Sequence, residues 1–128
     1  MSIELAVAIT TCGSVDQAER LGRLLVEQRL AACVQIGSAV RSVYPWEGRI
    51  ETASEIPMSI KTLPERIPDL KQAIENYHPY SVPELLILST SEALRTYAEW
   101  VGDWVGEAAC DEVDTGSHGT EPHEQDDE

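Results

Sequence analysis

Two residues of this chain, Cys12 and His78, belong to the types that bind soft metal ions. Cys12 stands in a predicted turn just before the first predicted helix, where backbone N–H groups and the helix dipole are expected to lower the pKa of a thiol. A thiolate is a soft ligand that suits copper, and an imidazole suits copper, zinc and nickel. The alternatives are a small turn residue at position 12 and, at position 78, a histidine whose hydrogen bonds hold a helix-to-strand turn.

Catalytic motifs are absent from the sequence. It contains no GxGxxG, P-loop, HExxH or GxSxG pattern, so we expect that the protein is not an enzyme. Its three cysteines, Cys12, Cys33 and Cys110, have no zinc-knuckle or CxxC spacing, which indicates free thiols in a reducing cytoplasm. His118 and His123 lie among carboxylates in a predicted tail, at a spacing that fits no defined site.

Charge is distributed unevenly along the chain. Residues 1–106 carry 14 acidic and 9 basic residues, a net charge of −5, while residues 107–128 carry 9 acidic residues and no Lys or Arg, a net charge of −9. Such a chain repels phosphate backbones and anionic membranes, so we expect neither nucleic acid nor a membrane as a partner. The acidic, Lys-poor composition would also suit the high-salt cytoplasm of a halophile.

The hydrophobic pattern predicts seven elements in the order β-α-β-β-α-β-α. Alternating or continuous apolar runs predict strands, and a three-to-four-residue apolar period predicts helices. Ser14 and Gln17 have the spacing of a capping box at the start of the first helix. The strands are predicted over residues 3–10, 31–43, 49–62 and 84–90, and the helices over residues 15–29, 63–77 and 92–105.

This order predicts an α+β, ferredoxin-like fold. In it, two helices cover one face of a four-stranded antiparallel sheet, and the third helix or neighbouring subunits cover the other face. The continuous apolar run over residues 84–90 is typical of a central strand. We predict a folded domain over residues 1–105 and a disordered acidic tail over residues 106–128.

Four segments taken together resemble the CutA family of divalent-cation tolerance proteins. They are LAACV at 30–34, YPWEGRI at 44–50, IKT at 60–62 and HPYSVPE at 78–84. The resemblance implies a ferredoxin-like homotrimer located in the cytoplasm. It also implies a role in tolerance to copper and other divalent metal ions, and kinship with PII-type signalling trimers that bind small effectors between subunits. In some members, residues matching Cys12 and His78 are proposed copper ligands.

The resemblance also marks residues that could line a ligand cleft between subunits. They are Cys33, Trp46, Lys61, Tyr80 and Glu84, with Lys61 and Glu84 forming a polar cluster. The alternatives are a buried small residue for Cys33, an ion pair at a subunit seam for Lys61, and interface packing for the two aromatic residues.

We therefore expect a cytoplasmic homotrimer that responds to divalent metal ions, with possible copper binding through Cys12 and His78. The alternatives are a small-effector-binding signalling trimer and an interaction scaffold without a specific ligand.

Overall fold

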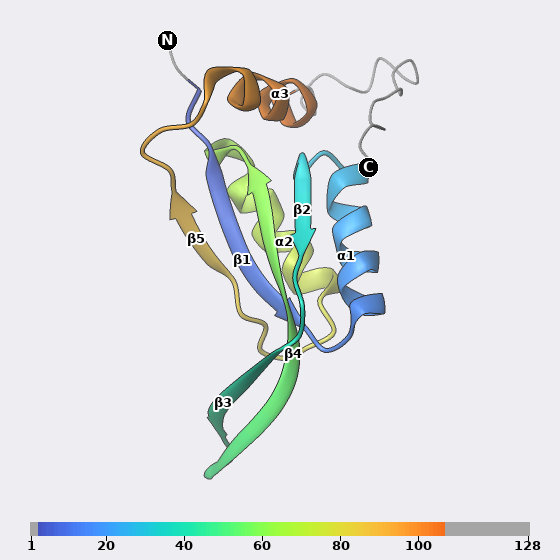
Figure 1. Cartoon of the computed structure of the whole chain (residues 1–128). Coiled ribbons are helices and arrows are strands. Elements are labelled where there is room, and N and C mark those ends of the chain that lie inside the picture. Colours follow the sequence, from blue (N-terminus) through green and yellow to red (C-terminus); the bar gives the residue numbers. More distant parts are fainter. Residues whose placement is uncertain (1–2, 107–128) are drawn as a thin grey trace.

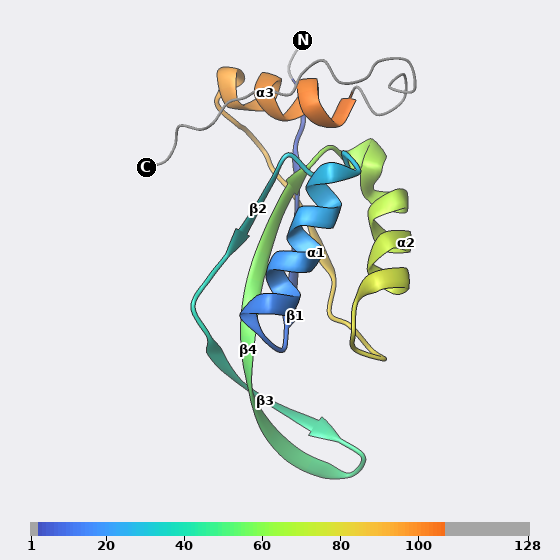
Figure 2. The same ribbon diagram turned by 90° about the vertical axis from the view of Figure 1, so that its right-hand side faces the viewer.

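A computed structural model of the chain describes residues 3–106. Five strands form one antiparallel sheet, two helices lie against one of its faces, and a third helix crosses one end of it (Figures 1 and 2). The strands are β1 (Ala6–Cys12), β2 (Cys33–Ile36), β3 (Val40–Trp46), β4 (Arg49–Thr62) and β5 (Leu86–Ser89). The helices are α1 (Val15–Glu27), α2 (Ile67–Tyr77), which follows a 3-10 turn (Pro64–Arg66), and α3 (Arg95–Gly106). None of these helices is long and apolar enough to cross a bilayer.

The sheet has the predicted ferredoxin-like topology. Its strand order is β2-β4-β1-β5, and β3 adds a further pairing to β4. The two central strands, β1 and β4, pair over seven residues from Ala6↔Thr62 to Cys12↔Ile56. This long register fixes which side chains of the two strands face the helices.

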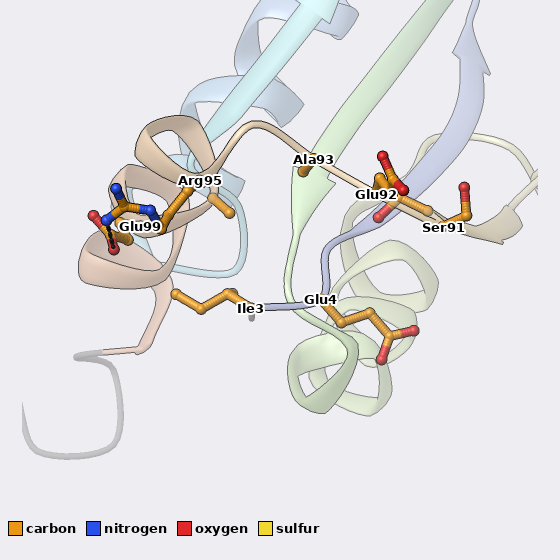
Figure 3. Close-up of a pocket in the computed structure, with 9 residues that line it drawn as sticks. Ile3, Glu4, Ser91, Glu92, Ala93, Arg95 and Glu99 are labelled. Atoms are coloured by element: carbon orange, nitrogen blue, oxygen red, sulfur yellow. Dashed lines mark hydrogen bonds and ion pairs between the residues drawn. The ribbon is translucent and has the colours of Figure 1, made fainter. Parts of the chain in front are cut away.

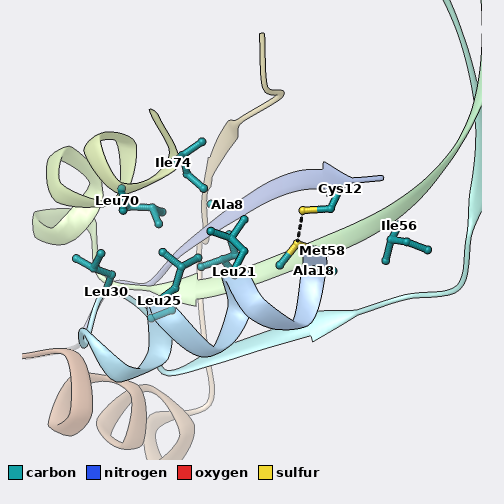
Figure 4. Close-up of a cluster of buried hydrophobic side chains, with 13 residues drawn as sticks. Ala8, Cys12, Ala18, Leu21, Leu25, Leu30, Ile56, Met58, Leu70 and Ile74 are labelled. Atoms are coloured by element: carbon teal, nitrogen blue, oxygen red, sulfur yellow. Dashed lines mark hydrogen bonds between the residues drawn. The ribbon is translucent and has the colours of Figure 1, made fainter. Parts of the chain in front are cut away.

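Helices α1 and α2 cover one face of the sheet, and the other face is largely open. Even-numbered residues of β1 and β4, such as Ala8, Ile56 and Met58, pack under α1 and α2 in the main core (Figure 4). Odd-numbered residues lie on the opposite face. On the same open side, β5 presents Leu86 and Leu88, which are 56% and 50% exposed. The open face is therefore apolar where it borders β5.

Helix α1 begins as its sequence predicts. The Ser14 hydroxyl accepts the N–H of Gln17 at 3.1 Å. The Gln17 side chain accepts the N–H of Gly13 at 3.0 Å, one residue earlier than in a standard capping box. Ala18, Leu21 and Leu25 form the buried stripe of the helix.

The predicted single strand over residues 31–43 is wrong, because the chain divides it at Gly37. The Gly37 N–H donates to the Pro57 carbonyl at 2.9 Å, and the pairing partner changes from Met58 at the end of β2 to Glu55 at the start of β3. Pro57 thus opposes the gap between β2 and β3, a position that proline tolerates.

Strands β3 and β4 form a long hairpin that extends beyond the helices (Figure 1). Its turn is shorter than the predicted one, because β3 continues to Trp46 and only two residues connect the strands. Glu47 and Gly48 both have positive φ angles, 53° and 81°. Two such residues in succession are typical of a type I′ turn, whose twist matches that of the strands.

Two further predictions need correction. Helix α2 begins at Ile67 rather than at residue 63, because Pro64 starts a 3-10 turn and Pro68 occupies the first turn of the helix. Strand β5 was predicted to be central, but it is an edge strand of the single chain.

Of the predicted acidic tail, only Gly106 is described, and it ends α3; residues 107–128 lie outside the described residues.

Helix α3 closes a second, smaller core. Its Ala98, Val101 and Val105 pack on Leu5, Ala32 and Leu63. Arg29, which has a φ of 58° just after α1, places its guanidinium 3.6 Å from the centre of the Trp104 ring and donates to the Trp104 carbonyl at 3.0 Å. The Trp104 indole donates to the Val26 carbonyl at 2.9 Å. Trp104 therefore joins α3 to the end of α1.

Replacing Trp104 by alanine is expected to lower the free energy of unfolding by about 2 kcal/mol, because packing, a cation–π contact and a hydrogen bond are lost together. Urea denaturation of the full chain measures this change. The control is Asp103→Ala, an exposed change on the same helix, which should stay within about 0.5 kcal/mol of the parent. Equal losses in both variants would refute the role given to Trp104.

Candidate functional site

Cys12 and His78 come together in the structure. Cys12 is the last residue of β1 and is fully buried among core side chains (Figure 4). His78 follows α2 and is 8% exposed. The Cys12 Sγ lies 3.9 Å from the His78 Nε2, so two residues 66 positions apart in sequence form a pair.

A third soft donor, which the sequence analysis missed, adjoins the pair. The Met58 Sδ lies 3.6 Å from the Cys12 Sγ, and Figure 4 marks this contact. A methionine on a strand usually fills a core gap, so its residue type alone carries no sign of a site. The only available signal is the alternation of β4, which places position 58 on the same face of the sheet as Cys12.

The imidazole of His78 is held by the backbone at both nitrogens. Its Nδ1 accepts the N–H of Tyr80 at 3.1 Å, and its Nε2 donates to the Thr11 carbonyl at 2.7 Å. These bonds correspond to the tautomer with its proton on Nε2. His78 therefore ties the turn after α2 to the end of β1, as the structural alternative predicted.

The prediction that the pKa of Cys12 is lowered is wrong. Burial raises the pKa of the thiol, and the negative charge of Glu55 raises it further. The pKa is raised because the Cys12 side chain, at the end of β1, points into the core and not toward the N–H groups at the start of α1. A raised pKa favours the neutral thiol of Cys12.

The chemistry of the donor set fits a soft metal ion. A thiol, a thioether and an imidazole converge from β1, β4 and the turn after α2. Thiolate and thioether sulfur atoms favour Cu(I), whereas hard cations prefer oxygen ligands. Over residues 3–106, no group of three or more His, Cys, Asp or Glu side chains is placed to hold a metal ion. The methionine is therefore the third donor that this set offers.

Glu55 forms hydrogen bonds with two residues next to the Cys12–His78 pair. Its carboxylate accepts the Tyr80 hydroxyl at 2.9 Å and the Thr11 hydroxyl at 3.2 Å. A hydrogen bond from the Ser42 hydroxyl, with those of Tyr80 and Thr11, lowers the pKa of Glu55 against the opposing effect of burial. Burial and the Glu55 carboxylate raise the pKa of Tyr80 to about 12. Glu55 was not among the predicted site residues.

Two predicted cleft residues lie next to each other on the open face of the sheet. Cys33 of β2 is the register partner of Lys61 of β4. The Lys61 ammonium donates to the Gln35 side chain at 2.5 Å. Cys33 is half-buried and contacts Tyr97 of α3, and burial together with Cys33 raises the pKa of Tyr97.

The other predicted cleft residues lie elsewhere in the single chain. Trp46 is at the tip of the hairpin and is 45% exposed. Glu84 precedes β5, where its carbonyl accepts the Thr10 hydroxyl at 2.6 Å. Within residues 3–106, the structure forms no ion pair between Lys61 and Glu84, because Lys61 opposes Val7, at the other end of β1 from Thr10. The polar cluster, which was predicted for a cleft between subunits, would therefore have to join two subunits.

A cavity of about 630 Å³ lies away from all of these residues. It is bounded by the start of the chain, the segment between β5 and α3, and α3 itself (Figure 3). Its charged side chains include Glu4, Glu92 and an exposed ion pair, in which Arg95 and Glu99 are 3.5 Å apart. It contains neither a predicted site residue nor a soft metal donor.

Comparisons with known proteins agree with the resemblance. The family model for the CutA1 divalent ion tolerance protein matches residues 6–103. The divalent-cation tolerance protein CutA of Thermus thermophilus is 36% identical over 100 residues, which cover 78% of this chain and 97% of that protein. The human protein CutA is 36% identical over 109 residues, which cover 85% of this chain and 60% of the human one.

Solved structures agree as well. CutA from Xylella fastidiosa has a TM-score of 0.77 at 34% identity, covering 79% of this chain and 97% of that one. The divalent cation tolerance protein CutA from Archaeoglobus fulgidus, which is described as periplasmic, has a TM-score of 0.76 at 31% identity, covering 79% and 98%. The α+β fold expected from the sequence is thus confirmed.

The carboxylate of Glu55 is expected to stabilise the fold in a pH-dependent manner. Because its pKa is lower in the folded state, its contribution is complete above its ordinary pKa and disappears as the pH falls through the folded value. At pH 7, Glu55→Gln should lower the free energy of unfolding by about 1 kcal/mol, and at a pH well below the ordinary pKa of Glu the difference between the two proteins should shrink. Urea denaturation at both pH values measures the difference, and a difference of the same size at both would contradict the charge-based account.

Proposed function

The chain belongs to the CutA1 divalent ion tolerance family, and we propose that it acts in the response to divalent metal ions as a homotrimer that binds copper as Cu(I) through Cys12 and His78. The observation that carries this proposal is the 3.9 Å separation of the Cys12 Sγ and the His78 Nε2, with the Met58 Sδ 3.6 Å from the same sulfur. We propose a binding role rather than an enzymatic one.

Binding requires rearrangements of protons at both residues. Cys12 must lose its thiol proton, because the thiolate is the metal ligand. His78 must present a lone pair on Nε2, which now donates to the Thr11 carbonyl. The ring proton then moves to Nδ1, where the N–H of Tyr80 now donates, so both backbone bonds of the ring break. Copper binding is therefore coupled to loosening of the turn over residues 78–80.

The homotrimer is supported by the open face of the sheet. Leu86 and Leu88 are half-exposed on an edge strand whose apolar sequence is typical of a central one. Uncovered apolar edges invite association, and a closed symmetric oligomer removes them. The family resemblance supports three subunits rather than two.

A cytoplasmic location is part of the proposal. Cys12 and Cys33 are free thiols in the described part of the chain, as suits a reducing compartment. Fractionation of cells that produce the protein, with a cytoplasmic and a periplasmic marker enzyme, tests the location directly. Recovery with the periplasmic marker would refute it.

A small-effector-binding trimer is the second candidate, and Cys33 with Lys61 on the open face favours it. An effector would have to be bound between subunits, because Trp46 and Glu84 lie apart from that pair in a single chain. Mass spectrometry of the native protein, purified without added metal, would detect a retained organic molecule. Its loss in Lys61→Gln, with copper binding absent, would favour this candidate.

Replacing Cys12 by serine is expected to weaken Cu(I) binding at least a hundredfold, because the only thiolate of the donor set is removed. His78→Gln and Met58→Leu should weaken it about tenfold each. The measurement is an anaerobic competition titration of the full chain, in a background where Cys110, His118 and His123 are replaced by Ser, Gln and Gln. The parent should bind about one Cu(I) per chain.

The control for this titration is Cys33→Ser, which removes a thiol from the open face and should leave Cu(I) affinity unchanged. Equal affinities for the parent and Cys12→Ser would refute the copper site. A loss of affinity in Cys33→Ser equal to that in Cys12→Ser would move the site to the open face.

Replacing Leu88 by aspartate is expected to convert the trimer to monomers, because three charges would be buried at the subunit contacts. Light scattering coupled to size-exclusion chromatography measures the molar mass, from 14.1 kDa for one chain upward. The matched control is Val15→Asp, which adds the same charge at a half-exposed apolar residue of α1. A monomeric parent would refute the assembly.

A further inference from the structure

The Cys12–His78 pair is closed to solvent. Cys12 is fully buried and His78 nearly so, whereas their neighbour Tyr80 is only half-buried. The hydroxyl of Tyr80 lies near Gly13, the residue after Cys12: a Cβ on Gly13 would be 3.5 Å from it. Tyr80 therefore borders both members of the pair on their solvent side.

Tyr80 is held in this position by three contacts. Its N–H donates to the His78 Nδ1, and its ring meets the His78 ring edge-on, with ring centres 4.8 Å apart and an interplanar angle of 63°. Its hydroxyl donates to the Glu55 carboxylate at 2.9 Å. The first two contacts are with His78 in the same turn and would move with it. Only the hydrogen bond to Glu55 attaches Tyr80 to the sheet, at β4.

Glu55 is well placed for that attachment. It lies on β4 opposite Val40, where the hairpin begins, and its pairing fixes its position independently of the turn after α2. The same carboxylate accepts the hydroxyl of Thr11, whose carbonyl accepts the Nε2 proton of His78. One carboxylate thus joins the two backbone segments that carry Cys12 and His78.

We propose that Glu55 is a positioning residue that holds Tyr80 closed over the Cys12–His78 pair, and that release of the Tyr80–Glu55 hydrogen bond admits a soft metal ion or thiol reagent to Cys12. The importance for copper rests on the proposed function, whereas the closure itself rests on the geometry alone. The closed form keeps a soft-donor site inaccessible until the turn over residues 78–80 opens. Opening of this turn is also the movement that coordination by Nε2 requires.

The test measures how fast the Cys12 thiol reacts with a chromogenic disulfide reagent, with Cys33 and Cys110 replaced by serine in the full chain. Tyr80→Phe, which keeps the ring but loses the hydroxyl, should react about tenfold faster than the parent, because a hydrogen bond to a charged group is lost. Glu55→Ala should react at least as fast as Tyr80→Phe, because it also removes the charge that raises the pKa of the thiol. Glu55→Gln, which can still accept the hydroxyl bond, should react at a rate between those of Glu55→Ala and the parent.

The double variant Glu55→Ala/Tyr80→Phe distinguishes closure from general weakening. If both residues act through one bond, it should react at about the rate of Glu55→Ala alone, whereas independent effects would multiply. Glu51→Ala, four residues away on the same strand, is the matched control and should react like the parent. Urea denaturation of each variant gives the unfolded fraction with which the rates are compared.

Rates in Tyr80→Phe and Glu55→Ala equal to that of Glu51→Ala would overturn the closure. So would rates that multiply in the double variant, or that follow the unfolded fraction. The readout needs no metal, so it is separate from the copper titration. If Tyr80→Phe and Glu55→Ala speed the thiol reaction but the parent binds no copper, the proposed function is refuted and the closure is supported. If the parent binds copper but these variants do not speed the thiol reaction, only the closure is refuted.

Discussion

The alternation of side chains along β4 is the constraint on which the rest of the structure depends. This strand pairs with β1, β2 and β3, so its register decides the facing of nearly the whole sheet. Its even positions, Ile56, Met58 and Ile60, enter the core under the helices, and its odd positions, including Glu55 and Lys61, lie on the other face. A shift of one residue would exchange the two sets.

This alternation separates the two kinds of chemistry that the sequence suggests. The soft donors Cys12 and Met58 lie on the helix-covered face, where burial keeps a thiol neutral. Lys61 and Cys33 lie on the open face, where a partner chain or small ligand can reach them. The proposed metal site and the proposed effector cleft are therefore not two interpretations of one place. They lie at different ends of the sheet, because Glu55 and Cys12 are near the end of β1, whereas Lys61 opposes Val7 near its start.

Much of the fold could be predicted from the sequence, because hydrophobic periodicity reports which face of an element is buried. The α1 stripe and the long strand β4 were predicted closely. At position 37 the glycine indicates a bulge or bend in the strand, but the change of pairing partner is revealed only by the hydrogen bond from Gly37 to Pro57. Strand β5 was placed in the centre because a continuous apolar run indicates burial on both faces, without indicating which chain supplies the cover.

The candidate site was predictable only in part, for a different physical reason. Residue type identified Cys12 and His78 as candidates. Their chemistry depends on where their side chains point, and this is decided by packing between residues that are far apart in sequence. The thiol was expected to face the start of α1 and faces Met58 instead. Glu55 was invisible because an acidic residue on an exposed hairpin is ordinary; only its contact with Tyr80, 25 positions away, distinguishes it.

The position of β5 at the edge of the sheet links the proposed trimer to the Cys12–His78 pair. In the trimer that we propose, a neighbouring chain covers Leu86 and Leu88, so β5 is edge in one chain and interior in the assembly, and its apolar sequence fits the assembled state. Glu84 lies two residues before this strand begins, and its carbonyl accepts the hydroxyl of Thr10. Thr11, the next residue, holds the ring of His78 through its carbonyl. In the proposed trimer, subunit contacts at β5 are therefore linked to His78 through two hydrogen bonds, from the Thr10 hydroxyl to the Glu84 carbonyl and from His78 to the Thr11 carbonyl, which gives assembly a short physical route to the closure at Tyr80.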